Sequence, residues 1–340
     1  MNLATAIAAR DADALPGRRD EDWRWTDLRG LIRTVPEPSA PLSAAEAGEG
    51  PFAGLAERTV QIANGRGEAS LAITADAVVA LDVVSKGDGA HAASIGIVVA
   101  PGVRATLLES YRGAGSYLAH TALAIDLGEG ARLERIVLAA EDADGVAVSQ
   151  AAVELAPKAE LVQTTLTGGA RRQRLETRVR HPGGYAKLRL DGAYLLFDKR
   201  HSDLTTSVTH AGLHGETDQL TKGVVRDQAR GVFQGRIVVA EGADHTEARM
   251  GHHALVLSDH AEVDAKPELE IYADDVSCAH GNTVGALDEE ALFYIRQRGV
   301  PEPEARAMLT EAFVGEVIDR IEHDGAREAA RAWAVERLRG

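Results

Sequence analysis

The chain has 340 residues, a length that suggests two domains of average size or one long repetitive domain. Hydrophobic residues make up 45% and aromatic residues only 4%, so we expect a sizeable but mainly aliphatic core. Aspartate and glutamate number 52 against 37 lysines and arginines, and the net charge of −15 disfavours nucleic acid and anionic membrane surfaces as partners.

The chain predicts neither membrane insertion nor export. Its apolar runs fall far short of the roughly 20 residues that a membrane-spanning helix needs. The N-terminus has acidic residues where a signal peptide has a basic start, so we expect a cytoplasmic protein. The single cysteine, Cys278, excludes an internal disulfide and any all-cysteine metal site built from this chain alone.

Residues 1–35 are predicted to form an N-terminal helical segment, broken at Pro16–Gly17. Its apolar anchors are Leu3, Ile7, Leu15, Trp23, Leu28 and Leu31. Residues 36–59 are rich in proline, alanine, glycine and glutamate, a composition typical of a linker or a poorly ordered loop.

Residues 60–286 consist of short apolar runs separated by turn residues, and these runs repeat. Val103, Ala131 and Ala159 occupy matching places in three copies, at intervals of 28 residues. One such unit cannot bury its apolar face alone, whereas stacked copies share a continuous core, so we predict a parallel β-helix. The alternative is a β-sandwich, because hairpin signals such as Asn64–Gly65 and Asp88–Gly89 are also present.

Residues 287–340 are predicted to be a helical domain. One helix begins at Leu287 and ends at Gly299, and a longer one runs from Pro303 to His323 with an apolar stripe that includes Phe313, Val317 and Ile321. This stripe is expected either to dock partly on the β-helix and partly on a partner, or to pack wholly inside the protein. A third helix is expected over Arg327–Arg339.

Common enzyme motifs are absent: there is no phosphate-binding loop, nucleophile elbow, zinc-binding helix or dinucleotide-binding glycine triplet. We therefore expect no catalytic turnover from the chain. Arg171–Arg200 holds nine basic and three acidic side chains. The simplest interpretation of this patch is a solvated face, and the alternative is a site for an anionic ligand or an acidic partner.

Five histidines fall close together in the sequence. The simplest interpretation places His245, His252, His253 and His260 on exposed strands or turns. The fifth belongs to Cys278–Ala279–His280, where residues i and i+2 of a strand project to the same face, so that a thiol and an imidazole form a pair of soft ligands. A buried cysteine beside a hydrogen-bonded histidine explains the same motif.

The stretch from His201 to Ile321 resembles the SufB/SufD family of iron–sulfur cluster assembly proteins, and within it most closely the SufD members. The motifs that carry the resemblance are Lys222–Val224, Val232–Arg236, Lys266–Ile271, Ala273–Val276, Cys278–Gly281 with Thr283–Gly285, and Leu292–Tyr294. Near the N-terminus, Glu21–Thr26 is similar to a short tryptophan-containing motif of the family. Asn282 and His252–His253 depart from the family pattern, which leaves the role of these two histidines open.

The resemblance implies a right-handed parallel β-helix flanked by N- and C-terminal α-helical segments. It implies a non-enzymatic subunit that pairs with a SufB-like subunit through the β-helix and binds a SufC-like ATPase through the C-terminal helices, with Phe313, Val317 and Ile321 as candidate contacts. His280 is then the candidate metal and cluster ligand at the partner interface, with Cys278 beside it. The isolated chain is expected to hold no cofactor, the cluster being transient in the complex. A homodimer and a monomer are the two alternatives for the chain without a SufB-like partner.

A function of another class also fits a β-helix, namely a hydrolase or lyase acting on polyanionic sugars. Paired carboxylates such as Asp274–Asp275 or Asp198 with Asp203 are the candidates for its acid–base chemistry. Neighbours on a strand point to opposite faces, so Asp274 and Asp275 cannot act as a pair there. Turn or surface positions are the simpler interpretation of all four.

Overall fold

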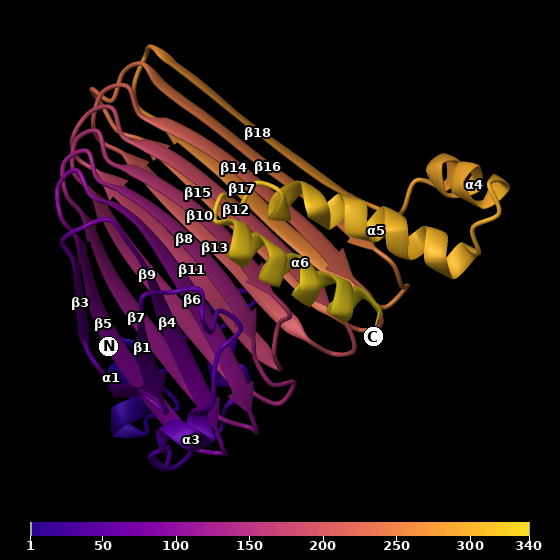
Figure 1. Cartoon of the computed structure of the whole chain (residues 1–340), viewed down its shortest axis with the longest axis horizontal. Coiled ribbons are helices and arrows are strands. Elements are labelled where there is room, and N and C mark those ends of the chain that lie inside the picture. Colours follow the sequence, from indigo (N-terminus) through magenta and orange to yellow (C-terminus); the bar gives the residue numbers. More distant parts are fainter. Residues whose placement is uncertain (1, 340) are drawn as a thin grey trace.

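The computed structural model describes residues 2–339, and its body is a parallel β-solenoid in which the chain alternates between two sheets (Figure 1). The larger sheet has ten strands: β1 (Arg58–Ala63), β2 (Arg66–Gly67), β4 (Ala77–Lys86), β6 (Arg104–Ala114), β8 (Arg132–Ala140), β10 (Glu160–Thr167), β12 (Lys187–Leu196), β14 (Glu216–Val225), β16 (Thr246–Val256) and β18 (Val276–Gly285). The smaller sheet has eight: β3 (Ser70–Ile73), β5 (Ala90–Val99), β7 (Leu118–Leu127), β9 (Val146–Leu155), β11 (Arg172–His181), β13 (His201–His210), β15 (Arg230–Val239) and β17 (Glu262–Ile271).

The predicted parallel β-helix is confirmed, and the repeat has the predicted register. Val103, Ala131 and Ala159 each directly precede a strand of the larger sheet, and the residues that follow them, Arg104, Arg132 and Glu160, are aligned across β6, β8 and β10. The 28-residue interval is therefore one coil. The β-sandwich alternative fails because the strands pair in parallel, apart from the β1–β2 hairpin, whose turn is Asn64–Gly65.

Six successive coils turn into the larger sheet at a residue with left-handed backbone geometry. Gly102 and Gly130 hold this place in two coils, with φ of 71° and 64°. The next four coils hold it with residues other than glycine: Lys158, Tyr185, His214 and His245, with φ from 55° to 62°. Each of these six residues donates its N–H to a carbonyl of the following coil, which offsets the backbone strain. The rings of Tyr185, His214 and His245 stack at 4.7 Å intervals along this corner.

The main core fills the space between the two sheets and is largely aliphatic, as the composition predicts. Alternate residues of each strand point inward, for example Leu133 and Val137 of β8, and both are almost fully buried. Parallel coils stack like residues over one another, so the apolar rows continue from coil to coil.

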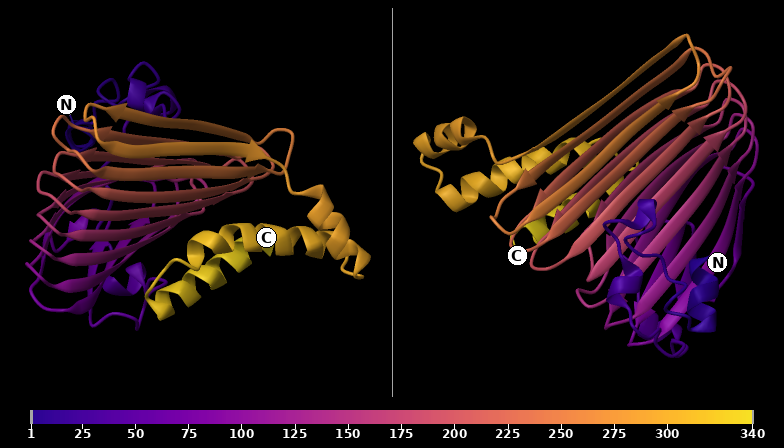
Figure 2. Two further views of the ribbon diagram at one scale, coloured as in Figure 1. Left: turned by 90° about the horizontal axis from the view of Figure 1, so that it is seen from above. Right: turned by 180° about the vertical axis from the view of Figure 1, so that it is seen from behind.

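The N-terminal segment lies on the outer face of the smaller sheet, opposite the C-terminal helices (Figure 2). It contains α1 (Leu3–Ala9), the short 3-10 helix η1 (Glu21–Trp23) and α2 (Leu28–Leu31). The helices are shorter than predicted, because Arg10 ends α1 with a φ of 56° well before Pro16. Residues 36–59 are packed on the body: α3 (Ala44–Ala47) lies there, and Phe52 is buried against the larger sheet.

The C-terminal region forms α4 (Glu289–Gln297), α5 (Glu302–Ile318) and α6 (Asp324–Arg339). Helices α5 and α6 cover the outer face of the larger sheet, whereas α4 stands away from the body (Figure 1). Helix α5 ends at Ile318, five residues before the predicted end, so Ile321 lies in the connection to α6. Within the described residues, no helix combines the length and apolar character that crossing a membrane requires.

Candidate functional site

The last coil, formed by β17 and β18, leaves one end of the solenoid open. Strand β18 is the final strand of the larger sheet and β17 that of the smaller one, so each lacks a neighbour on its outer side among residues 2–339. Side chains along this coil are half-buried or exposed, and Ile271 and Val284 are 44% and 47% exposed. The coil therefore presents unpaired backbone groups together with apolar side chains.

Cys278 and His280 both lie on β18, and the i, i+2 spacing places them on the same face of the strand. Cys278 aligns with Ala248 of β16 and packs at the edge of the main core, whereas His280 aligns with Met250 and is exposed. Partial burial raises the pKa of the Cys278 thiol, although the backbone of Ala248 opposes the shift. At neutral pH the pair thus offers an accessible imidazole and a protonated thiol.

Two donor groups do not complete a metal site. In the part of the chain that the structure describes, no group of three or more histidine, cysteine, aspartate or glutamate side chains is placed to hold a metal ion. A cluster or an iron ion bound at Cys278 and His280 requires further ligands from another chain. The role of both residues as ligands stays a prediction.

His252 is not on the surface, contrary to the sequence interpretation. It lies on the inward face of β16, fully buried, with its ring stacked on Phe233 at 4.6 Å. The Tyr194 hydroxyl donates to Nε2 at 2.9 Å, and Nδ1 donates to Asn282 Oδ1 at 2.7 Å. The alternation of Ala248, Met250, His252 and Ala254 along the strand was a signal for this inward position. His252 therefore ties β18 to the preceding coil.

Acid is expected to weaken the structure through His252. Burial lowers the pKa of His252 to about 4, whereas an unfolded histidine has a pKa of about 6.5. Between these values the unfolded chain binds more protons, so the free energy of unfolding falls as the pH drops from about 6.5 to 4. Over this range the titration of His252 lowers the free energy of unfolding of the wild-type protein by roughly 3 kcal/mol at most. We expect the His252→Asn variant to lack this contribution.

The measurement for this prediction is urea denaturation at pH 7 and pH 4.5, with wild-type protein and the variant compared at both. His91, His201 and His210 also have pKa values lowered by burial, and they contribute equally to both proteins. His260→Asn is the control, since His260 is exposed on a turn. An equal loss of stability in wild type and His252→Asn would contradict the prediction.

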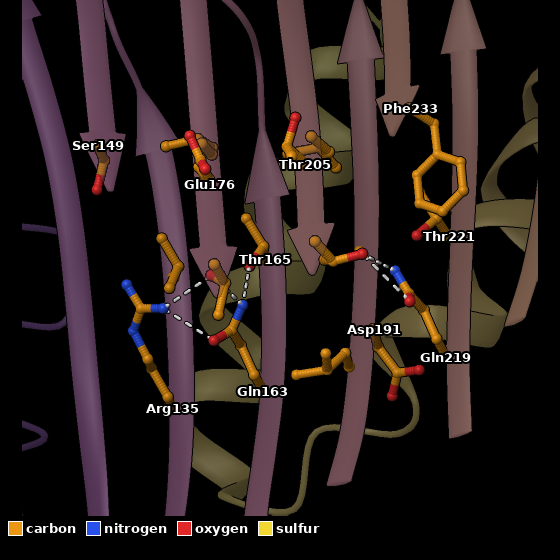
Figure 3. A pocket seen from close by; sticks show the side chains of 17 residues that line it. Arg135, Ser149, Gln163, Thr165, Glu176, Asp191, Thr205, Gln219, Thr221 and Phe233 are labelled. Carbon is orange, nitrogen blue, oxygen red and sulfur yellow. Dashed lines mark hydrogen bonds between the residues drawn. The ribbon is translucent and has the colours of Figure 1, made fainter. Parts of the chain in front are cut away.

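A band of polar side chains crosses the middle of the core, and no sequence pattern predicted it. Arg135 of β8 forms a buried ion pair with Glu109 of β6 at 2.7 Å. The chain of contacts continues from Arg135 to Gln163 at 2.8 Å and from Gln163 to Thr177 at 3.0 Å (Figure 3). Arg135, Gln163 and Thr177 help to line a cavity of about 30 Å³, which has room for about one water molecule.

The candidate partner-binding residues lie at the junction of the C-terminal helices with the body. Val317 and Ile321 are buried against the larger sheet, with 0% and 1% of their surface exposed. Phe313 is half-buried, and the Lys222 ammonium lies 4.3 Å from the centre of its ring. The structure thus shows internal contacts for all three, and a direct contact with a partner stays a prediction.

The carboxylates considered for sugar chemistry do not form a catalytic pair. Asp203 is fully buried and ion-paired with Arg174 at 2.8 Å, so the surface position suggested for it is wrong. Asp274 and Asp275 are exposed at the turn between β17 and β18, where Asp275 pairs with His245 at 2.8 Å. Nothing in this arrangement favours a sugar-cleaving enzyme.

These features define a class of protein: a two-sheet parallel β-solenoid with helices on both outer faces and an open last coil that carries a cysteine and a histidine. Residues 83–313 match the family model described as SUF system FeS cluster assembly, SufBD core domain. The chain therefore belongs to the SufBD family. The match begins well before His201, in coils where only the repeating texture was visible in the sequence.

Known relatives agree with this family. The chain is 32% identical to the iron–sulfur cluster assembly protein SufD of Escherichia coli over 244 residues, which are 71% of this chain and 58% of the relative. It is 29% identical to a SufBD family protein of Synechocystis over 66% of this chain and 52% of the relative. It thus spans little more than half the length of these two relatives. A SufBD family protein of Mycobacterium tuberculosis is 28% identical over 97% of this chain and 92% of its own length.

Proposed function

We propose that this chain is a SufD-like, non-catalytic subunit of an iron–sulfur cluster assembly complex in the cytoplasm. In this proposal it pairs with a SufB-like subunit through its last coil and binds a SufC-like ATPase through its C-terminal helices. The observation that carries the proposal is the open end of the solenoid, where β17 and β18 have no further strand beside them among residues 2–339 and β18 carries Cys278 and His280. A lone cysteine suits a reducing compartment, where it remains a free thiol.

The open coil supports pairing with a chain of similar shape. Edge strands with free N–H and C=O groups associate readily with another strand, and the exposed Ile271 and Val284 add apolar area to such a contact. A SufB-like β-helix ends in strands of the same kind, if it shares this family's fold. In this proposal, two copies of the chain pair through the same edge strands when the SufB-like partner is absent.

In the proposed interface the cluster is cargo rather than a resident cofactor. His280 supplies an imidazole that is a good iron ligand, and Cys278 supplies a thiol two residues away. The remaining ligands come from the SufB-like subunit, so the isolated chain binds iron weakly or not at all.

The C-terminal helices support the proposed ATPase contact. Helix α4 stands away from the body (Figure 1). Its Phe293 and Tyr294 are 61% and 59% exposed. Met308 of α5 is 48% exposed. Large exposed apolar side chains of this kind commonly lie in protein interfaces. Phe313, Val317 and Ile321 then act in binding mainly by holding α5 against the sheet.

The proposed function is tested by co-expression with candidate SufB-like and SufC-like subunits. We expect His280→Ala to leave the complex intact and to reduce its iron and sulfide content severalfold, because a cluster ligand is missing. Cys278→Ala is expected to have a smaller effect, since a packed thiol also explains that residue. His260→Ala, on an exposed turn, is the control.

Three results would each contradict a part of this proposal. One is failure of the chain to co-purify with either subunit, which removes the complex itself. Another is an intact complex in which His280→Ala retains full cluster content, which leaves His280 without a role as a ligand. ATP hydrolysis by the purified chain alone would contradict its assignment as a non-catalytic subunit.

A further inference from the structure

A cavity of about 650 Å³ opens where the N-terminal segment meets the start of β11. Its lining is strongly basic: five of the nine lining residues are arginines, namely Arg18, Arg19, Arg29, Arg33 and Arg172. Asp27 is the one carboxylate of the lining and Leu31 its one large apolar side chain. The cavity lies on the outer face of the smaller sheet, far along the chain from the last coil.

Most of these arginines lack a partner. Arg18, Arg19, Arg33 and Arg172 form no ion pair with any of the residues that the structure describes, although acidic residues outnumber basic ones in the chain by 52 to 37. Arg29 is the fifth: its Nε donates to the Leu15 carbonyl at 2.8 Å, and its ion pair is with Asp20, at 3.8 Å. The positive charge that gathers here is thus left uncompensated in a protein with an excess of carboxylates.

Arg172 is the most constrained of the five. It is half-buried, and its Nε is fully shielded from solvent without a hydrogen-bond partner. Burial lowers the pKa of its guanidinium, and the positive charges of Arg230 and Arg171 add to this shift. An anion in the cavity would satisfy the buried donor and relieve the repulsion between these groups.

The Asp27 carboxylate does not act as the missing partner of Arg172. Its Oδ1 accepts the Gly30 N–H at 2.7 Å and caps the start of α2. It attracts Arg172 only from beyond ion-pair distance. The lining arginines therefore keep an excess of about three positive charges after Asp27 and Asp20 are counted.

We propose that this cavity binds an oligophosphate, either inorganic or the phosphate chain of a nucleotide. Guanidinium groups present planar pairs of donors that match phosphate oxygens, and a di- or triphosphate carries about as much negative charge as the lining leaves unbalanced. The lining has no aromatic side chain on which a base would stack, so recognition centres on the phosphates. A concave lining with a half-buried arginine also suits a small anion better than the flat surface of an acidic protein.

The test is isothermal titration calorimetry of the full chain with tripolyphosphate in low-salt buffer. We expect saturable binding that weakens as salt is added, because the lining is open to solvent. Arg172→Ala and Arg33→Ala should each weaken binding about tenfold, the usual effect of losing one charge-assisted contact. Arg104→Ala is the control: Arg104 is exposed on β6 of the larger sheet and is not part of the cavity lining, so its loss should change affinity less than about twofold.

Two further titrations identify the ligand. ATP that binds more tightly than tripolyphosphate assigns the site to a nucleotide, whereas equal affinities assign it to the phosphate chain itself. Citrate that binds as tightly as tripolyphosphate would overturn the phosphate assignment. Two results would refute the site itself: no binding at millimolar tripolyphosphate, or variants at Arg33 and Arg172 that bind as well as Arg104→Ala. Arg33 is exposed, so its variant keeps the test valid even where Arg172→Ala folds poorly.

Discussion

Arg135→Ala is expected to lower the free energy of unfolding by about 3–5 kcal/mol, the usual cost of leaving one buried charge without its partner. Arg135 and Glu109 are 2% and 0% exposed, and the guanidinium holds both carboxylate oxygens at 2.7 and 2.8 Å. Burial lowers the pKa of Arg135, but the charges and hydrogen bonds of Glu109 and Tyr111 together raise it above its usual value, so the guanidinium stays charged. Removing the Arg135 guanidinium leaves the buried Glu109 carboxylate without its ion-pair partner. It also removes the hydrogen bond that Arg135 donates to Gln163 Oε1.

Urea denaturation followed by circular dichroism measures this loss. Arg58→Ala is the matched control, because Arg58 contacts Glu68 at 2.6 Å while both side chains are 49% exposed. An exposed pair of this kind contributes at most about 1 kcal/mol. The double variant Glu109→Leu/Arg135→Met should recover much of the loss, since neither charge is then left buried alone. If Arg135→Ala and Arg58→Ala lower the free energy of unfolding equally, the buried ion pair contributes no more to stability than the exposed one, and the prediction is wrong.

Ile321→Ala is expected to destabilise the layer of C-terminal helices by about 2–5 kcal/mol, the range for removing a buried isoleucine. Ile321 is 1% exposed and lies in the apolar cluster that joins α5 and α6 to the larger sheet. The cavity left behind removes contacts on both sides of this junction. Amide hydrogen exchange in α5 and α6 should therefore accelerate more than exchange in the central strands.

Met308→Ala is the control for this prediction, because Met308 lies on α5 with 48% of its surface exposed. Its effect on stability should stay within about 0.5 kcal/mol. Binding of a SufC-like ATPase to Ile321→Ala separates the two roles of the stripe. If Ile321→Ala loses the ATPase with unchanged exchange protection, Ile321 is a direct contact and the packing role argued above is wrong.

The repeat is the feature of the fold that the sequence predicts best. Val103, Ala131 and Ala159 mark one coil each, because parallel stacking demands a small apolar residue at the same corner of every turn. Asn64–Gly65 does form a hairpin turn, as its sequence indicates, but this turn joins only β1 and β2 at the start of the larger sheet. Turn chemistry specifies local geometry, whereas the pairing of distant strands decides between a sandwich and a solenoid.

The sequence is less informative about which polar residues are buried. His252 and Asp203 were both predicted at the surface and are fully buried. A histidine or aspartate is tolerated in a core only where partners from other coils satisfy it, as Tyr194 does for His252 and Arg174 for Asp203. These partners lie 58 and 29 positions away in the chain, so local pattern does not reveal them.

By itself, the sequence determined the parallel solenoid, the three C-terminal helices and the cysteine–histidine pair on one strand. Each of these follows from local spacing, because the side-chain period of a strand or helix is set by backbone geometry. Only the tertiary structure decided that the pair lies on the uncovered last coil, that the Arg135–Glu109 pair is buried, and that arginines from the N-terminal segment converge on Arg172. Such convergence depends on how coils and segments remote in the chain pack together, which no local period encodes.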